Sequence, residues 1–366
     1  MASSPKPCSS PDPSGIAAAL LDWFDGRRRD VPWRGERDPY PLLVAEVMAQ
    51  QTRLDTAIPF HRRFMARFPD VRALAAADED EVLKLWEGLG YYARARNLRR
   101  AAQVVVAEYG GRFPDTASEL RRLPGVGPYT AGALASLAFG RPEPAIDGNA
   151  RRVLSRLHDL EAATPSALDV PARSLLQGAP ERPGALNQAL MDLGSAVCTP
   201  RRPQCGECPV SAGCLARRRG TIALRPPARV RARPPTRYEA AAVVLREGRI
   251  LVLRRPATGL LGGLWDFPSF SLAPSARPRA TLAEGLRAEL GLVCRVGDEI
   301  RELAHAFSHF RLRLALHSAS WLDGEVRTDR PHRWATTDGL AELAFPVYQR
   351  RFIDRELRGR QGRPGS

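Results

Sequence analysis

The stretch Leu123-Pro-Gly-Val-Gly127, followed by a helical run from Tyr129 to Phe139, decides the fold of the first half of the chain. Gly125 and Gly127 stand two residues apart and open the helix, a pattern that allows a tight turn between two helices. The main-chain N–H groups at the start of the helix can then bind a phosphate without a charged side chain. A DNA phosphate would fit at the turn formed by Leu123, Gly125, Val126 and Gly127, but the pattern alone is weak, because an ordinary glycine-rich turn between two helices is its usual explanation.

A second segment, Ile146-Asp-Gly-Asn149, follows this run and precedes a helix with Val153, Leu154 and Leu157 on one face. Taken alone, Asp147 or Asn149 predicts a helix N-cap, because a short polar side chain accepts hydrogen bonds from the first free N–H groups. The turn and this segment together are far more specific than either one alone.

Glu46 lies on a third segment, from Leu42 to Gln51, with Pro41 suited to a first helical turn. Leu42 and Leu43 precede Glu46 by four and three residues, so the carboxyl shares a helix face with apolar side chains. If that face is buried, desolvation raises the pKa of Glu46 and keeps it protonated near neutrality. The alternative is a partly exposed glutamate near a helix end.

Four cysteines fall within seventeen residues in the pattern C-x6-C-x2-C-x5-C, which indicates a metal site in a chain with too few cysteines for a disulfide scaffold. Four thiolates on one loop could hold zinc or an iron–sulfur cluster, and structural zinc sites more often have two close pairs. The four residues are Cys198, Cys205, Cys208 and Cys214.

The turn and the downstream aspartate resemble the helix-hairpin-helix superfamily of DNA glycosylases. Three further motifs are similar to its adenine DNA glycosylase branch: Glu46-Val-Met-Ala-Gln-Gln-Thr52, Gly88-Leu-Gly-Tyr-Tyr-Ala-Arg94 and Met191-Asp-Leu-Gly194. The resemblance runs from about residue 16 to the C-terminal region. It implies a [4Fe-4S] cluster on the four cysteines and, as partner, double-stranded DNA containing adenine:8-oxoguanine mispairs. The implied reaction is hydrolysis of the N-glycosidic bond of adenine opposite 8-oxoguanine or guanine, in base excision repair.

The resemblance also implies roles for single residues. Glu46 would be the acid that protonates the leaving adenine, and Asp147 would either stabilise the positive charge left on the sugar or bond to the sugar transiently before water completes the reaction. Tyr129 and Asn149 would orient these two groups. Gln51 and Tyr91 match the wedge residues of the family, which fill the gap left by a flipped nucleotide. Arg94 begins a run of arginines that forms either a phosphate-facing surface or a solvated helix face.

Tyr129 also separates two subfamilies. Bifunctional glycosylases of the endonuclease III type carry a lysine just after the hairpin, which attacks the sugar as a Schiff-base nucleophile. Tyr129 occupies that position here, and the only lysines are Lys6 and Lys84. We therefore expect a monofunctional glycosylase. The alternatives are a bifunctional glycosylase and AP lyase, and a non-catalytic iron–sulfur protein that binds DNA.

The C-terminal part contains Gly262-Gly-Leu-Trp-Asp-Phe-Pro268 and Glu284-Gly-Leu-Arg-Ala-Glu-Leu-Gly-Leu292, which resemble the Nudix fold. Gly285 and Ala288 stand where an active Nudix helix has metal-binding acids, so pyrophosphate hydrolysis is not expected. The resemblance assigns 8-oxoguanine recognition to Phe307, Ser308 and His309, on a turn between two strands.

The expected fold class is a mainly α helix-hairpin-helix glycosylase region with a cluster loop, followed by an α+β Nudix-like domain. The expected parts are a disordered tail (1–14), the helical region (15–216, cluster loop 198–214), a basic Pro/Arg linker (217–237), the Nudix-like domain (238–356) and a second disordered tail (357–366). A hairpin turning at Glu247-Gly248 and the alternation of Leu312, Leu314 and Leu316 indicate strands in the last domain.

The charge balance agrees with an anionic partner. The chain has 55 basic and 40 acidic residues, a net charge of +15, which favours a polyanion such as DNA. Genome composition accounts for the preference for arginine over lysine, but it does not account for the net positive charge. No segment approaches the ~20 apolar residues that cross a bilayer, and no signal peptide is recognisable. We expect a cytoplasmic bacterial protein, associated with the nucleoid through DNA, acting as a monomer without membrane contact.

Overall fold

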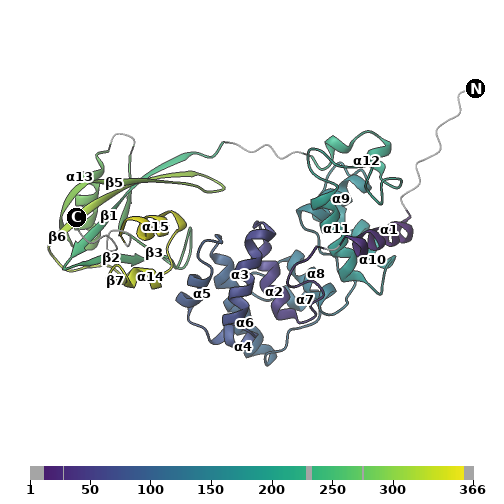
Figure 1. The fold of residues 1–366 in the computed structure, drawn as a ribbon, viewed down its shortest axis with the longest axis horizontal. Helices are drawn as coiled ribbons and strands as arrows, with labels where there is room; N and C mark the ends of the chain where they lie inside the picture. The colour runs from purple at the N-terminus through teal and green to yellow at the C-terminus, as the bar shows by residue number, and fades with distance from the viewer. Residues whose placement is uncertain (1–11, 28, 228–232, 274–275, 358–366) are drawn as a thin grey trace, which may run out of the picture. The chain divides into compact units, whose positions relative to one another are not determined.

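The computed structural model describes residues 12–27, 29–227, 233–273 and 276–357 (Figure 1). The chain divides into two compact units, one formed by Met1–Ala76 and Asn97–Val230 and the other by Ala77–Arg96 and Arg231–Ser366. Most of both predicted tails, residues 1–11 and 358–366, lies outside the described residues. None of the helices described is long and apolar enough to cross a membrane.

The first unit is helical, which confirms the predicted fold class for this part of the chain. Asp12 caps the first helix by accepting hydrogen bonds from Ser14 and Gly15, so that helix begins at Pro13. The described helices of this unit are α1 (Pro13–Gly26), α2 (Pro39–Ala49), α3 (Leu54–Arg67), α4 (Val71–Ala76), most of α6 (Ala93–Tyr109), α7 (Ala117–Leu120), α8 (Pro128–Leu137), α9 (Gly148–Leu157), α10 (Pro165–Gln177), α11 (Pro183–Ala196) and α12 (Leu215–Arg218), with a 3₁₀ turn at Ile222–Leu224.

Helices α1, α9, α10 and α11 share one core of this unit. Leu20, Leu154, Leu175 and Leu193 are among its buried side chains, and each such burial contributes roughly 1.5–3 kcal/mol. Three cysteines of the predicted cluster loop pack at the edge of the same core. Helix α9 therefore has a fixed position relative to that loop.

The predicted turn joins α7 to α8. The N–H of Val126 donates to the carbonyl of Leu123 at 3.1 Å, and Gly125 has a φ of +77°, which favours glycine. A Cβ at Gly125 would also lie 2.7 Å from the Cβ of Asn97. Leu123 and Val126 are only 2% and 7% exposed, so their side chains hold the turn to the core, and a DNA contact there is left to the main chain.

The segment from residue 143 to 146 leads into α9 and lies directly against α8. A Cβ at Gly132 would come within 2.0 Å of the carbonyl oxygen of Pro144, so only glycine permits this approach. The buried Asn187 of α11 fixes the segment further, by donating to the carbonyl of Glu143 at 2.9 Å and accepting from the N–H of Ala145 at 3.1 Å. These contacts set the position of Asp147, which directly follows this segment.

The second unit contains a seven-stranded sheet in the order β3-β2-β1-β6-β5, with β4 paired to β1 and β7 to β2. Strands β1 and β6 are parallel, and the other pairs are antiparallel. The predicted hairpin at Glu247-Gly248 and the alternating burial of Leu312 and Leu314 are both present. The strands are β1 (Thr236–Arg246), β2 (Arg249–Arg254), β3 (Trp265–Asp266), β4 (Ser269–Ser271), β5 (Val293–Ala306), β6 (Arg311–Asp323) and β7 (His332–Ala335).

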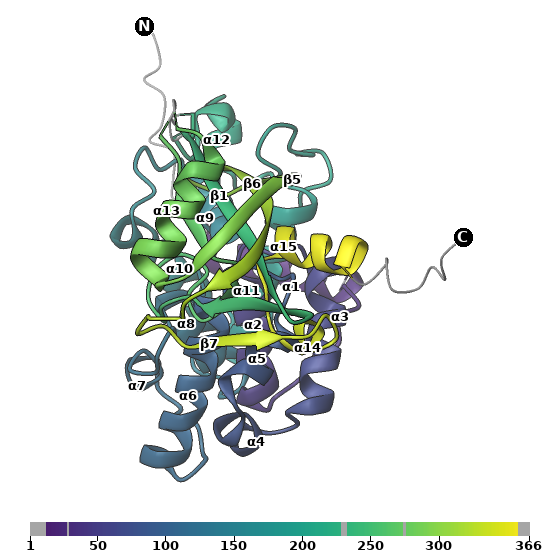
Figure 2. The ribbon, with the colours of Figure 1, turned by 90° about the vertical axis from the view of Figure 1, so that its left-hand side faces the viewer.

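Helices cover both faces of this sheet, as expected for the predicted α+β domain. Helix α13 (Pro278–Leu290) packs through Leu282 and Leu286 on one face (Figure 2). The helices α14 (Gly339–Glu342) and α15 (Val347–Phe352), followed by a π-helical turn at Ile353–Leu357, contribute to the core of the other face. A Cβ at Gly285 would lie 2.5 Å from the ring of Phe270, so this helix could not carry an acid at that position without moving away from β4.

Residues Ala77–Arg96, including α5 (Glu79–Leu85), lie in sequence within the predicted helical region and pack with the second unit. Glu87 accepts hydrogen bonds from Arg350 and from the N–H of Phe345, both at 2.9 Å. Arg254 pairs with Asp80 at 2.6 Å. These ion pairs and hydrogen bonds, between residues far apart in sequence, hold the segment to the rest of the second unit.

The first residues of the expected linker are folded. Asp159 accepts hydrogen bonds from Arg219 at 3.1 Å, Thr221 at 2.5 Å and Arg225 at 2.8 Å. The sequence predicted a self-repelling, extended stretch, but this buried carboxylate neutralises two of its arginines. Residues 228–232 of the expected linker lie outside the described ranges.

We predict that Gly132→Ala destabilises the first unit by about 1–3 kcal/mol, because the added methyl group must displace the segment at Pro144. Thermal unfolding measures the change. Gly148→Ala is the matched control, since a methyl group there would meet no other part of the chain within 4 Å. Equal melting of the two variants would contradict this account of the packing.

Candidate active site

Glu46 lies in the last turn of α2. Asp38 caps this helix by accepting from the N–H of Tyr40 at 2.9 Å, and Pro39 occupies the first turn, which suits its fixed φ. Leu42 and Leu43 are buried, as expected for the face that Glu46 shares. The prediction that this face is apolar and covered is confirmed.

Tyr129, at the start of α8, donates its hydroxyl proton to Oε2 of Glu46 at 2.5 Å. Burial raises the pKa of Glu46 above its usual range, and the negative charge of Asp147 raises it further. The hydrogen bond from Tyr129 and the charge of Arg34 act in the opposite direction but do not cancel the rise. Burial and the neighbouring carboxyl also raise the pKa of Tyr129 well above its usual value, so the phenol remains a donor.

Asp147 is the N-cap of α9. Its Oδ1 accepts from the main-chain N–H groups of Asn149 at 2.9 Å and Ala150 at 2.6 Å, and its Oδ2 accepts from the side-chain amide of Asn149 at 2.9 Å. These donors fix the orientation of both carboxyl oxygens at the start of the helix. The two predicted carboxyl groups thus meet at one site in different surroundings.

A further ion pair borders the site, and the sequence analysis missed it. Arg34 contacts Asp192 of α11 at 2.9 Å, and Arg29 lies 3.6 Å from the same carboxylate. Burial raises the pKa of Asp192, although both arginines oppose the rise. Asp192 lies within the quoted motif Met191–Gly194, but its arginine partners are about 160 residues away, so no local pattern could have paired them.

Arg152 was also missed, and it connects the site to the cysteine loop. Its Nη2 donates to Oδ1 of Asn149 at 2.9 Å, while its Nε donates to the main-chain carbonyl of Cys198 at 2.7 Å. Asn149 in turn holds Asp147. A continuous chain of hydrogen bonds therefore runs from the first cysteine of the loop to the capping carboxylate.

A carboxylic acid kept protonated beside a charged carboxylate can divide acid catalysis and charge stabilisation between them. In glycoside cleavage, such a pair donates a proton to the leaving group and stabilises positive charge on the sugar. The arrangement of Glu46 and Asp147 has the chemical features of this pair.

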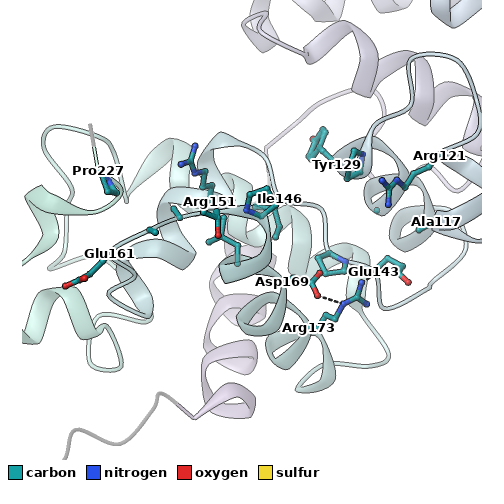
Figure 3. Close-up of a pocket in the computed structure, with 18 residues that line it drawn as sticks. Ala117, Arg121, Tyr129, Glu143, Ile146, Arg151, Glu161, Asp169, Arg173 and Pro227 are labelled. Carbon is teal, nitrogen blue, oxygen red and sulfur yellow. Dashed lines mark hydrogen bonds and ion pairs between the residues drawn. The ribbon is translucent and has the colours of Figure 1, made fainter. Parts of the chain in front are cut away.

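A groove of about 820 Å³ lies next to the site, with Tyr129 and Ile146 on its wall (Figure 3). Arg121 and Arg151 also line it, which makes part of its wall basic. Arg173, by contrast, pairs with Asp169 at 3.0 Å.

The predicted wedge residues have unusual backbone conformations. Gln51 and Tyr91 have φ values of +54° and +50°, a region that residues other than glycine rarely occupy and that is enriched at functional sites. Tyr91 is 50% exposed. Arg94 differs from its predicted role on a phosphate-facing surface: its guanidinium lies over the rings of Trp86 and Tyr91 and donates to the carbonyl of Gly90 at 3.1 Å. Burial lowers its pKa to about 10.

The predicted recognition turn connects β5 to β6. The N–H of Phe307 donates to the carbonyl of Phe310 at 2.9 Å, and their rings stack at 4.6 Å. Ser308 and His309 are exposed at the tip. The two phenylalanines anchor the turn, and the exposed Ser308 and His309 lie within hydrogen-bond distance of each other, 3.4 Å between Oγ and Nδ1.

The four predicted cysteines line one small cavity. Burial and the proximity of the other three thiols raise the pKa of Cys208 to about 11. Within the described ranges, no three His, Cys, Asp or Glu side chains are arranged to hold a single metal ion.

Three domain families match this chain. Residues 44–176 match the HhH-GPD superfamily of base excision DNA repair proteins, residues 198–214 the iron–sulfur binding domain of endonuclease III, and residues 240–355 the NUDIX domain. Adenine DNA glycosylase of Homo sapiens is 35% identical, over 92% of this chain and 74% of that protein. The chain belongs to the adenine DNA glycosylase family.

A second family member, from Mus musculus, is 36% identical over 97% of this chain and 80% of its own length. The structure of a thermostable thymine-DNA glycosylase has a TM-score of 0.52 and 30% identity, covering 57% of this chain and 97% of that one. This adenine DNA glycosylase family member is therefore a base excision repair enzyme that acts on DNA and hydrolyses N-glycosyl bonds.

The iron–sulfur match confirms the predicted [4Fe-4S] cofactor. The residues fit it, because four half-buried cysteines line one small cavity and cysteine thiolates are the ligands that hold iron–sulfur clusters. Cys198, Cys205, Cys208 and Cys214 would hold the cluster, and the family match favours it over zinc, the alternative that the spacing alone left open.

We predict that Glu46→Gln stabilises the folded protein increasingly as pH rises above about 4.3, the usual pKa of a glutamate in an unfolded chain. In the folded protein the carboxyl keeps its proton to higher pH, so above that value the unfolded state binds fewer protons and the parent loses stability with rising pH. Glutamine does not titrate, so the variant does not lose stability in this way. The gain is limited to about 1.4 kcal/mol for each pH unit up to the raised pKa.

Denaturant melts of both proteins between pH 4 and 8 measure this gain. A difference in unfolding free energy that stays constant across the range would contradict the raised pKa.

Proposed function

We propose that this enzyme is a monofunctional glycosylase that removes adenine mispaired with 8-oxoguanine in duplex DNA, and also adenine opposite guanine. The observation that carries the proposal is the buried Glu46 carboxyl, bonded to Tyr129 and raised in pKa beside Asp147. Adenine is a poor leaving group as an anion, so it needs the proton that such an acid supplies.

In the proposed reaction, Glu46 donates its proton to a ring nitrogen of the adenine. The bond between the sugar C1′ and the base nitrogen breaks, and its electron pair leaves with the base as neutral adenine. A water molecule then adds to C1′ and returns a proton to the Glu46 carboxylate. Because Tyr129 donates to Oε2, Oε1 is the oxygen left to carry the transferred proton.

Asp147 stabilises the positive charge that develops on the sugar. Its two oxygens are fixed by main-chain and Asn149 donors, so it need not reorganise as the charge appears. Asn149 and Arg152 act as positioning residues, since they hold Asp147 and do not depend on contact with the substrate.

Strand cleavage is not part of the proposed reaction. The resemblance places the lysine nucleophile of bifunctional relatives at Tyr129, and that phenol is engaged with Glu46. The residues Lys6 and Lys84 do not follow the hairpin in sequence. Borohydride therefore should not trap a strong covalent adduct between protein and DNA.

DNA binding combines several elements of the chain. The main chain at Gly125 and Gly127 suits a phosphate, and Gln51 and Tyr91 would fill the gap left when the adenine leaves the base stack. The [4Fe-4S] cluster, held by the four cysteines, would shape the loop that carries Arg201 and Arg202 for phosphate contact. Recognition of 8-oxoguanine falls to the turn at Phe307–His309.

We predict that Glu46→Gln and Asp147→Asn each reduce base release by at least about 10²–10⁴-fold while DNA binding persists, because each removes one half of the acid and carboxylate pair. Single-turnover incubation with a duplex holding one adenine:8-oxoguanine pair, followed by alkali, measures release as nicking of the adenine strand. Glu108→Gln, an exposed change on α6, is the control and should keep parental activity.

The same assay tests the alternatives. Nicking without alkali would support a bifunctional lyase, and no nicking by the parent would support a non-catalytic DNA-binding protein. Full turnover by either acidic-site variant would remove that residue from the mechanism.

We predict that Ser308→Ala with His309→Ala lowers the preference for adenine:8-oxoguanine over adenine:guanine pairs, because the exposed hydrogen-bonding groups at the turn are lost. The ratio of single-turnover rates on the two duplexes should fall by roughly tenfold or more, on the scale of one to two hydrogen bonds. Ser118→Ala, a change in α7 outside this turn, is the control. An unchanged ratio would contradict the assignment of lesion recognition to this turn.

A further inference from the structure

Arg156 is a buried arginine in the last turn of α9. It is 4% exposed, and removing a charged group from water costs several kcal/mol unless partners replace the lost hydration. No carboxylate forms an ion pair with it anywhere in the described ranges. Its partners must therefore account for the buried charge in another way.

The guanidinium of Arg156 donates to three main-chain carbonyls and one sulfur. The carbonyls belong to Arg225 at 2.9 Å, Thr199 at 2.7 Å and Pro200 at 3.0 Å. The sulfur is Sγ of Cys198, 3.4 Å from Nη1. Carbonyls satisfy the N–H groups but carry no net charge, so the sulfur of Cys198, which is a thiolate when it holds a cluster, is the one partner in this set that can carry a negative charge.

Arg152 shows by contrast what is particular to Arg156. It lies one turn earlier on the same helix and donates to the carbonyl oxygen of Cys198, not to its sulfur. Arg151, its neighbour in sequence, lines the groove beside Tyr129. Of these three arginines of α9, Arg156 is the one that brings a charged donor to a ligand sulfur.

Hydrogen bonds to ligand sulfurs help to set the reduction potential of an iron–sulfur cluster. A charged donor favours the state with more electron density on the thiolate, which is the more reduced state. Loss of the donor therefore makes a cluster easier to oxidise and shifts its potential to more negative values.

We propose that Arg156 tunes the [4Fe-4S] cluster of this enzyme, by donating a charged N–H group to the Cys198 ligand that raises the reduction potential and protects the cluster from oxidation. The role concerns the cofactor, not base release, and it stands whether or not the proposed adenine:8-oxoguanine specificity is correct.

A purely structural role is the competing explanation. Arg156 also holds Arg225, which is bonded to Asp159 at 2.8 Å, and it ties down the loop at Thr199 and Pro200. A residue with only this role would change how well the cluster is retained, but not the potential of the clusters that remain.

The test compares the full-length parent with Arg156→Gln and Arg156→Lys, in the absence of DNA. Protein-film voltammetry measures the potential of loaded protein, and loss of the visible charge-transfer absorbance in ferricyanide measures oxidation. We expect Arg156→Gln to favour the oxidised state about tenfold, a negative shift of about 59 mV for one electron, and to bleach several-fold faster. Arg156→Lys keeps the charge without the planar fork and should shift less in the same direction.

Arg151→Gln is the matched control, because it removes an equal positive charge from the same helix, and Arg151 donates no hydrogen bond to a cysteine sulfur. It should leave the potential at the parental value. An unchanged potential in Arg156→Gln, or an equal shift in Arg151→Gln, would overturn the proposal. If Arg156→Gln retains no iron, the reduction potential of Arg156→Lys decides: a negative shift supports the proposal, and no shift or a positive shift overturns it. Loss of iron from both variants would show that Arg156 assembles the loop and does not tune the cluster.

Discussion

The hydrogen bond between Tyr129 and Glu46, 2.5 Å long and formed by two half-buried side chains, is the interaction on which the rest of the site depends. It joins the helix-hairpin-helix element to α2, two parts of the chain separated by 83 residues. Burial raises the pKa of the carboxyl, and the phenol limits that rise while fixing the orientation of the group. The same contact thus serves the fold and the chemistry.

Helix α9 organises the other half of the site. Asp147 caps its first turn, Arg152 links that cap to the cysteine loop, and Arg156 reaches the sulfur of Cys198 from its last turn. The approach of the preceding segment to α8 depends on Gly132. A single short helix therefore aligns the anionic carboxylate with the cofactor loop, and its packing in the shared core makes that alignment rigid.

Much of this could be predicted from the sequence because the signals are local. The glycine turn, the capping aspartate and the cysteine spacing each lie within a few residues, and the helical and α+β fold classes followed from periodicity and from the family resemblance. The ion pair of Arg34 with Asp192 joins residues 158 positions apart, and no pattern in either segment indicates it. Arg94 was assigned to the surface because arginines surround it in sequence, yet the aromatic rings of its own loop hold it. The roles of the individual site residues stay predictions.

The central claim is that Glu46, next to the carboxyl group of Asp147, keeps its proton to higher pH than an ordinary glutamate does. Infrared difference spectroscopy of the parent against Glu46→Gln, in the folded protein without DNA and over a range of pH, tests it most directly. The account predicts that a carbonyl stretch of a protonated carboxylic acid, absent from the variant, persists in the parent above about pH 4.3, the usual pKa of glutamate. Loss of that band at the usual glutamate pKa would contradict it.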